Sequence, residues 1–229
     1  MPSITSTRLS LPVLALLVAS PFAAFAQSAD SHDHDHDHDH GHEHAQGHDH
    51  AHDDVSRGYF EDSAIAARPL SDWQGDWQSV YPYLQNGTLD VVMARKAESG
   101  EKTAEEYRDK YEIGYKTDVD RIEIEGQEVT FHRPDGAVSG TYASDGYEVL
   151  TYDAGNRGVR FIFEKQDGDA EAPAFIQFSD HRIAPEPAGH YHLYWGDDRA
   201  ALLEELSNWP TYYPADLTGN EIAHEMMAH

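Results

Sequence analysis

The sequence contains no cysteine, which excludes disulfide bonds and zinc sites built on thiolate ligands. Basic residues are scarce: 16 lysines and arginines stand against 42 aspartates and glutamates, giving a formal net charge of −26. This charge argues against nucleic acid or anionic membranes as partners, because both need a basic surface. It fits a protein that attracts cations, and it fits equally well an acidity that only keeps an exported protein in solution. Long apolar runs are absent after the first residues, so no later segment is expected to span a membrane.

The first 26 residues have the pattern of a secretory signal peptide. Arg8 is the only charge ahead of an apolar stretch at residues 9–22, and Ala24-Phe25-Ala26 is a small-x-small cleavage site. The apolar stretch is short for a bilayer crossing, which favours export and removal over a membrane anchor. We therefore expect a mature chain that begins at Gln27 and is soluble outside the cytoplasm, since no cysteine can accept a lipid.

A histidine-rich segment follows the leader. Ten of the chain's 16 histidines lie between residues 32 and 52, and most of them alternate with aspartate. Imidazole nitrogens and carboxylate oxygens both bind divalent transition metals. Residues 27–56 have almost no large apolar side chains and are predicted to form a disordered arm. We expect weak, exchangeable metal binding by its histidines, which are His32, His34, His36, His38, His40, His42, His44, His48, His50 and His52.

Residues 57–229 are predicted to fold as one domain, mainly β with added helices. Helices are expected at residues 89–97, 104–111 and 199–206, with a last helix that Thr218 caps. Between them, short strands alternate with turns rich in glycine, aspartate, asparagine and proline. The predicted strands are residues 119–126, 128–132, 138–142, 147–152, 159–164, 174–178 and 190–195. No long helices separate them, so we expect an antiparallel meander that closes into a small up-and-down barrel to hide its edges.

One group of histidines inside the domain has the spacing of a metal site. His190 and His192 are two residues apart in a predicted strand, so their side chains share a face. His181 follows the preceding strand, and an antiparallel return would bring it across from that face. The sequence therefore predicts that His181, His190 and His192 converge as three ligands of a tetrahedral zinc site with one open position. Imidazole sites also accept Cd2+, Ni2+, Cu2+ and Co2+, so the metal itself is not determined.

The remaining candidates have plainer interpretations. His132, His224 and His229 are expected to be solvated or hydrogen-bonded, and Asp180 is expected to belong to a turn, although it could also accept a ring N–H of a ligand. Aromatic residues could line a ligand pocket, but core packing is favoured for them; they are Trp73, Trp77, Tyr81, Tyr83, Trp195, Trp209, Tyr212 and Tyr213. The chain has no supported Ser-His-Asp pattern, phosphate loop or dinucleotide fingerprint.

Four stretches together resemble the ZinT family of bacterial periplasmic zinc proteins, also described as cadmium-induced. The resemblance runs from about Tyr59 to the end of the chain. The first stretch reads SDWQGDWQSVYPYL from Ser71, and the second is Gly158-Val159-Arg160, followed by Phe161 where the family usually has tyrosine. The other two are IQFSDH from Ile176, and NWPTYYP from Asn208 together with EMMAH at the C-terminus.

The resemblance implies a lipocalin-like barrel, with Gly75-Asp76-Trp77 similar to the Gly-x-Trp signature near the first lipocalin strand. It also implies a zinc ion held by His181, His190 and His192, a periplasmic location, and a partner in the solute-binding component of a zinc ABC importer. The chain departs from relatives that have a cysteine pair in the barrel. That departure removes a covalent brace and leaves the predicted metal site unaffected.

Three functions are compatible with these sequence features. Zinc capture and delivery to the importer under zinc shortage is favoured, with an affinity that falls below about pH 6.5 as imidazoles are protonated. A zinc hydrolase or hydratase would also use three histidines and a water, but no base or oxyanion donor is recognisable near the motif. A lipocalin-like carrier of an apolar ligand is allowed by the aromatics, but histidines that point into the barrel would argue against an oily cavity.

Overall fold

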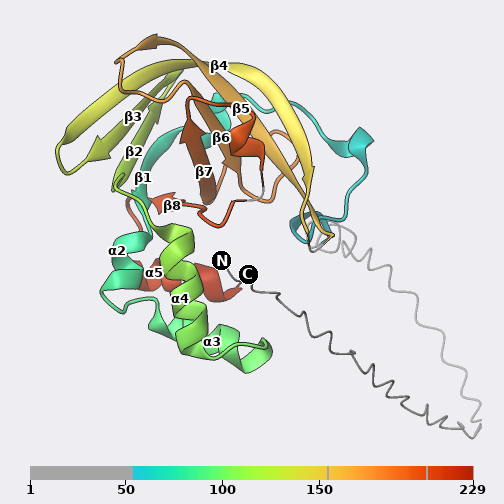
Figure 1. The fold of residues 1–229 in the computed structure, drawn as a ribbon, viewed down its shortest axis with the longest axis vertical. Coiled ribbons are helices and arrows are strands. Elements are labelled where there is room, and N and C mark those ends of the chain that lie inside the picture. Colours follow the sequence, from blue (N-terminus) through green and yellow to red (C-terminus); the bar gives the residue numbers. More distant parts are fainter. Residues whose placement is uncertain (1–53, 154, 205, 229) are drawn as a thin grey trace, which may run out of the picture. The chain divides into compact units, whose positions relative to one another are not determined.

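A computed structural model describes residues 54–153, 155–204 and 206–228 (Figure 1). The predicted leader and all ten histidines of the arm lie outside the described residues. The described chain starts with a helical turn at residues 54–56, where the amide of Gly58 donates to the carbonyl of Val55. Within this described part, none of the helices has the length and apolarity that a bilayer crossing requires.

Eight antiparallel strands form a closed barrel, in which each strand pairs with the next and the last pairs with the first. The predicted up-and-down barrel is therefore confirmed. The strands are β1 (Gly75–Ser79), β2 (Arg121–Glu125), β3 (Glu128–Arg133), β4 (Gly136–Thr151), β5 (Arg157–Gly168), β6 (Phe175–Ser179), β7 (Tyr191–Gly196) and β8 (Thr211–Pro214). Closure leaves no sheet edge for another chain to pair with.

Apolar side chains that alternate along the strands fill the barrel interior. The aromatic part of this core includes Trp77, Phe131, Phe161, Phe163, Phe178, Tyr191 and Tyr212, all buried. Trp73, from the short 3-10 helix η2 (Leu70–Trp73), adds to it and stacks on Phe178 with 4.6 Å between ring centroids. The interior is thus a packed core, and not the open cavity that a carrier of apolar ligands would need.

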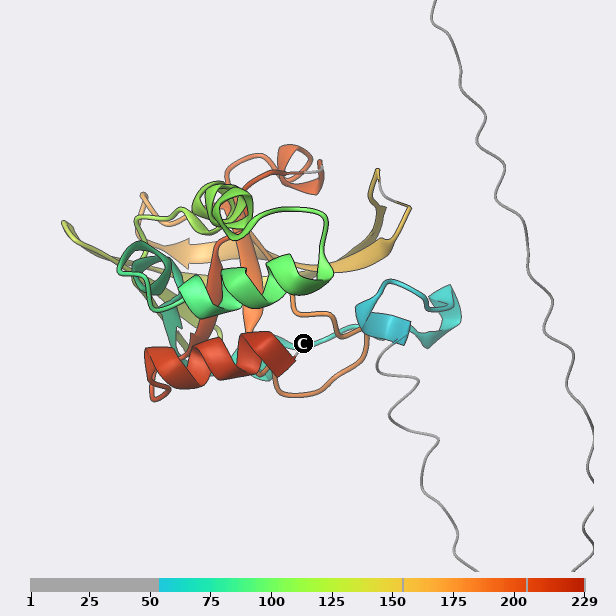
Figure 2. The same cartoon turned by 90° about the horizontal axis from the view of Figure 1, so that it is seen from below.

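The helices pack together beside the barrel and form a second apolar core (Figures 1 and 2). They are α2 (Tyr81–Gln85), α3 (Asp90–Ser99) and α4 (Ala104–Tyr115), all inserted between β1 and β2, and the C-terminal α5 (Gly219–Ala228). Thr103 and Glu106 form a capping box at the start of α4. Thr218 and Glu221 exchange the same pair of hydrogen bonds at the start of α5, so the predicted cap is confirmed.

The turn predicted between the strands at residues 138–142 and 147–152 is wrong. Asp145-Gly146 does not separate two strands, because β4 continues through it for 16 residues. The pairing with β5 shifts register between Ser144 and Tyr147, which marks a β-bulge at this point. Gly146 has a φ of 85° there, so its left-handed backbone is used to bend one strand and not to reverse the chain.

Two predictions near the C-terminus are also corrected. The segment from Asn208 to Pro214 lies outside the predicted strands and is interpreted from its prolines as a connection, but its second half is β8, which closes the barrel. The helix expected at residues 199–206 is reduced to the short 3-10 helix η3 (Ala201–Leu203). Its shortness is consistent with the side chain of Arg199 reaching across to Asp145 on β4 instead of following a helix surface.

Candidate metal centre

His190 and His192 lie on the outer face of the barrel wall. In β7 the alternating neighbours Tyr191 and Leu193 are fully buried in the barrel core. Side chains two residues apart share a face, so the two histidines point away from that core. The expectation that they point into the barrel is wrong, because the interior positions of this strand are taken by an aromatic and an aliphatic side chain. As predicted, the two imidazoles lie on the same face of the strand.

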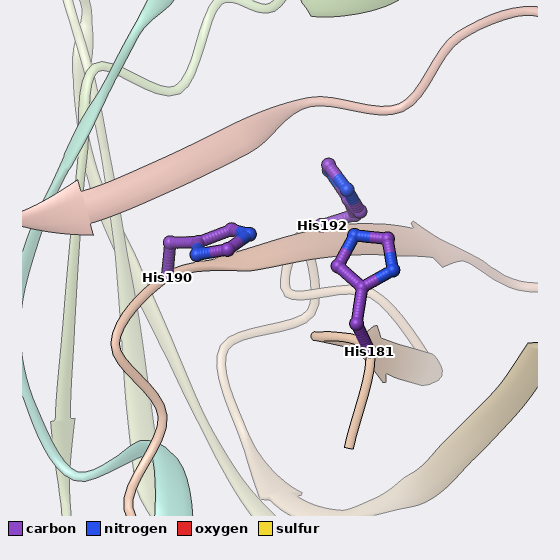
Figure 3. Close-up of side chains that lie close together, drawn as sticks. All are labelled: His181, His190 and His192. Carbon is purple, nitrogen blue, oxygen red and sulfur yellow. The ribbon is translucent and has the colours of Figure 1, made fainter. Parts of the chain in front are cut away.

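The third histidine comes from the loop that follows β6. Ser179 at the end of β6 pairs with His192 in β7, so the chain leaves β6 beside the two histidines. Figure 3 shows the imidazole of His181 turned toward those of His190 and His192. One ring nitrogen from each histidine lies within 4.8 Å of the others. The structure therefore brings together the three residues that the spacing selected.

His181 has an unusual backbone. Its φ is 63°, and it is the one non-glycine residue with a positive φ in the described part of the chain. The left-handed conformation costs a residue with a Cβ roughly 1–2 kcal/mol. This conformation turns the chain sharply at the end of β6 and directs the imidazole back over the barrel wall. The strain coincides with a candidate ligand, which is where stored strain is expected.

Hydrogen bonds determine which nitrogen His192 can offer. The Thr211 hydroxyl donates to the carbonyl of Trp209 at 2.9 Å, so its oxygen can accept from Nδ1 of His192, 2.8 Å away. Nδ1 therefore carries the proton and Nε2 keeps the lone pair. His190 is held differently, by stacking on the ring of Tyr213 with 5.0 Å between centroids and 10° between planes. Two of the three imidazoles are thus oriented by β8.

The local environment keeps His192 neutral. Burial lowers the pKa of His192 well below its usual value, and the neighbouring His181, His190 and Arg160 lower it further. A neutral imidazole is the form that binds a metal ion. His192 is therefore ready to act as a ligand at a pH where an exposed histidine is already largely protonated.

A buried arginine fixes the loop that connects the histidines. Arg68 donates from Nη1 to Asp180 at 2.6 Å, from Nε to Asp72 at 2.9 Å, and from Nη2 to the carbonyl of Glu186 at 2.7 Å. The carboxylate of Asp72 also accepts the amide of Glu186 at 3.0 Å, and its carbonyl accepts the amide of Ala188 at 2.7 Å. The segment around Arg68 therefore holds the loop at its start, next to His181, and near its end, next to His190.

Arg68 also contacts the barrel core. Its guanidinium carbon lies 4.2 Å from the centroid of the Trp73 ring and 5.2 Å from that of Phe161. Burial raises the pKa of Asp180, while the guanidinium of Arg68 acts in the opposite direction. Asp180 accordingly pairs with Arg68, and it also accepts the amide of Arg182 in the predicted turn. No sequence pattern predicts this pair, because its members are 112 residues apart and belong to no local motif.

A pocket of about 110 Å³ opens beside the histidines. His181 and His192 line it, together with residues from β5 to β7 and from the start of the described chain. The other lining residues are Val55, Ser56, Phe60, Tyr152, Asn156, Arg157, Gly158, Val159, Ser179, Arg182, Ile183 and Tyr194. No aspartate or glutamate is among these described residues, so they offer the pocket no carboxylate as a general base for a hydrolytic reaction.

The other histidines of the domain lie elsewhere. The Nε2 atom of His132 is 2.6 Å from the carboxylate of Glu123, and His224 is exposed on α5. Both match their expected roles as hydrogen-bonded and solvated residues. His229 and the ten histidines of the arm lie outside the described residues.

Comparison with known proteins gives one family. The sequence profile described as "ZinT (YodA) periplasmic lipocalin-like zinc-recruitment" matches residues 51–229. The "Probable metal-binding protein YrpE" of Bacillus subtilis (strain 168) is 61% identical over 176 residues, which cover 76% of this chain and 70% of that protein. The "Zinc-binding protein AdcA" of Streptococcus pyogenes serotype M1 is 54% identical over 180 residues, and this chain spans only 35% of its length.

The fold has a solved counterpart. The crystal structure of the Zn(II)-bound ZinT-like domain of Streptococcus pneumoniae AdcA superimposes with a TM-score of 0.74 at 48% sequence identity. The match covers 76% of this chain and 97% of that domain. The shared region therefore amounts to nearly the whole of that domain.

Proposed function

Because the chain belongs to the ZinT family, we propose that it captures zinc in the periplasm through His181, His190 and His192. The observation that carries the proposal is the approach of three imidazole nitrogens to within 4.8 Å of one another. The names of the relatives support the same metal: AdcA is called zinc-binding, and the similar AdcA domain was solved with Zn(II) bound. Cadmium, nickel, copper and cobalt are further candidates for an all-imidazole site.

The geometry fits a zinc ion after a small adjustment. Tetrahedral ligands at the usual Zn–N distance are about 3.3 Å apart, and the three ring nitrogens lie within 4.8 Å of one another. His190 and His192 are oriented by β8, whereas His181 is exposed and lies on a loop. We expect His181 to move inward when the ion binds. Three neutral ligands leave the fourth position for a water or an exchanging ligand.

The open position suits a protein that passes its metal on. A ligand from a partner can enter it before the three histidines release the ion, so the zinc is never fully solvated during transfer. We propose the solute-binding component of a zinc ABC importer as this partner, with no catalytic step on the chain itself. The relatives named as zinc-binding lipoproteins, such as AdcA of Streptococcus pneumoniae serotype 4, support a role on the outer side of the cytoplasmic membrane.

The histidine-rich arm is proposed to collect zinc for the three-histidine site. It would bind several ions weakly through its ten histidines, from His32 to His52. Val55 and Ser56, the last two residues of the predicted arm, belong to a helical turn and line the pocket that also contains His181 and His192. The chain therefore enters the described domain beside the candidate metal centre.

Zinc titration by calorimetry tests the proposal on the mature chain, residues 27–229. We expect one tight site plus several weak ones. The double substitution His190→Ala with His192→Ala should reduce the tight affinity by more than about a hundredfold. The double substitution His132→Ala with His224→Ala is the matched control, because it removes two histidines outside the candidate centre.

Deletion of residues 27–53 separates the two kinds of site. The weak sites should disappear and the tight site should remain. Tight one-to-one binding that survives loss of both His190 and His192 would rule out the proposed centre. Transfer is measured by mixing the zinc-loaded chain with the metal-free solute-binding component, and it should proceed faster than spontaneous zinc dissociation.

A further inference from the structure

The pocket beside the histidines has a composition opposite to that of the whole chain. The chain has 42 acidic residues and a formal net charge of −26. Yet none of the residues that line the pocket is acidic, and two of them, Arg157 and Arg182, are basic. Arg157 pairs with Asp62, and Arg182 pairs with Glu186. Neither of these two carboxylates lines the pocket. The pocket is therefore a site from which carboxylates of the described chain are kept away.

A third arginine lies behind the pocket wall. Arg160 on β5 is only 1% exposed, and its Nε and Nη1 atoms have no hydrogen-bond partner among the described residues. Its guanidinium carbon lies 3.2 Å from the ring centroid of Tyr194, which lines the pocket. Its cross-strand neighbour on β4, Glu148, pairs with Arg199 instead. A buried cation without a carboxylate is costly unless an anion compensates it.

The charge of Arg160 lies next to the pocket of the candidate metal centre. Its guanidinium stacks on Tyr194, which lines this pocket together with His181 and His192. Three neutral imidazoles leave both charges of a bound zinc ion uncompensated, and Arg160 adds a third positive charge close by. The described residues provide no acidic ligand in the pocket to balance them. An anion would therefore compensate the charge of both the metal and the arginine.

We propose that this pocket binds a small carboxylate, which occupies the open position of the metal and is held by the positive charge of Arg160 and Arg182. The inference rests on the proposed zinc site. A carboxylate oxygen is a normal zinc ligand, and a volume of about 110 Å³ accommodates a molecule of the size of acetate.

The carboxylate can belong to a free small acid or to an acidic side chain of the protein that receives the zinc. Both sources present the same group to the pocket. In the second case, the partner's carboxylate would enter the metal site as the first step of transfer. Replacement of the partner's acidic side chains by amides would then slow the transfer, whereas transfer would be insensitive to that replacement if only a free acid occupies the open position.

Cobalt provides the readout, because the visible absorption of Co2+ reports both its ligands and their number. The mature chain is loaded with one equivalent of Co2+ and titrated with acetate at constant ionic strength, with chloride and phosphate in parallel. We expect acetate to change the spectrum saturably and at lower concentration than the other two anions. Acetate should also increase the affinity of the chain for zinc in calorimetry.

Three single-charge variants locate the anion. Arg160→Gln should weaken acetate binding about tenfold, and Arg182→Gln about threefold, because Arg182 is half exposed and paired with Glu186. Arg95→Gln is the matched control, since it removes the same charge from an exposed pair on α3. Circular dichroism shows whether each variant is folded. If Arg160→Gln does not fold, the comparison of Arg182→Gln with Arg95→Gln decides.

The outcomes separate this inference from the proposed function. A cobalt spectrum that is insensitive to loss of His190 and His192 overturns the metal site, and the carboxylate site with it. A histidine-dependent spectrum that acetate does not change overturns the carboxylate site alone. So does an acetate affinity that is equal in the wild type and in all folded arginine variants.

Discussion

The two faces of the barrel wall between β5 and β8 are buried in different ways. The inner face is apolar and aromatic, with rings such as Phe161, Phe178 and Tyr191 packed against one another. The outer face holds polar groups, among them the unpartnered nitrogens of Arg160 and the unpartnered amide oxygen of Gln177. Hydrophobic burial on the inner face stabilises the fold, while polar groups on the outer face are left with unused binding capacity. The candidate metal ligand His192 therefore lies between two core residues of β7, Tyr191 and Leu193, and points to the opposite face.

The largest effect is expected at Arg68, which joins the two regions. Arg68→Met leaves Asp72 and Asp180 without their buried cation, so the metal-free protein should lose about 3–5 kcal/mol of unfolding free energy. Zinc affinity should fall as well, because the loop between His181 and His190 loses its brace. Denaturant titration and calorimetry measure the two quantities. Unchanged zinc affinity in a destabilised variant would show that Arg68 serves the barrel core alone.

Adjacent residues of β7 offer the sharpest test of the comparison. Leu193→Ala should cost the metal-free protein about 2–5 kcal/mol, because Leu193 is fully buried in the barrel core, while zinc affinity of the folded variant stays close to wild type. His192→Ala should have the opposite profile, with zinc affinity lost and a smaller loss of stability. Equal effects of the two substitutions on zinc affinity would remove the distinction between the faces.

A subtler change on the outer face concerns the orientation of His192. Thr211→Val keeps the shape of the side chain but removes the hydroxyl that accepts from Nδ1 of His192. Zinc affinity should decrease about 10–100-fold, the usual effect of losing a group that orients a metal ligand. Thr130→Val is the control, because its hydroxyl contacts Ser139 on β4. An equal affinity for zinc in both variants would argue against tautomer control by Thr211.

The smallest effect is a dependence on pH. Burial lowers the pKa of His192 in the folded protein. Below about pH 6.5, His192 of the unfolded chain is therefore protonated while His192 of the folded chain stays neutral. Stability of the metal-free protein is therefore fully present above that pH and declines as the pH falls toward the folded pKa, by at most about 1.4 kcal/mol per unit for this group. His192→Gln should flatten the decline. Denaturant midpoints measured across the range test the slope, and a variant as steep as the wild type would contradict this assignment.

The barrel and the histidine cluster could be predicted from the sequence because both depend on local patterns. Alternation of apolar residues identified most strands, and the i, i+2 spacing of His190 and His192 placed them on one face. A hairpin of the observed kind then brings His181 beside them. Local patterns gave a wrong prediction at Asp145-Gly146, because an Asp-Gly pair occurs both in turns and in β-bulges. Here it bends β4 and does not end it.

Long-range contacts explain the other misses. Thr211, Tyr212 and Tyr213 have β propensity, but β8 has only four residues and ends in proline, and it exists through its pairing with β1 and β7. The role of Arg68 depends on a residue 112 positions away. Among the described residues, Arg160 has no carboxylate partner on β4 because Glu148 is paired with Arg199. Such facts follow from the assembled barrel and not from any stretch of sequence.

The position of His181 requires both a left-handed backbone and an imidazole side chain. No single residue type meets both requirements well. Glycine would adopt a φ of 63° at no steric cost, but only histidine supplies the imidazole. His181→Gly should therefore make the metal-free protein more stable while removing a candidate ligand. In a lineage that no longer needed zinc, selection for stability alone would favour glycine here. The residue at this one position would then distinguish metal-binding descendants of the fold from those that have kept only the barrel.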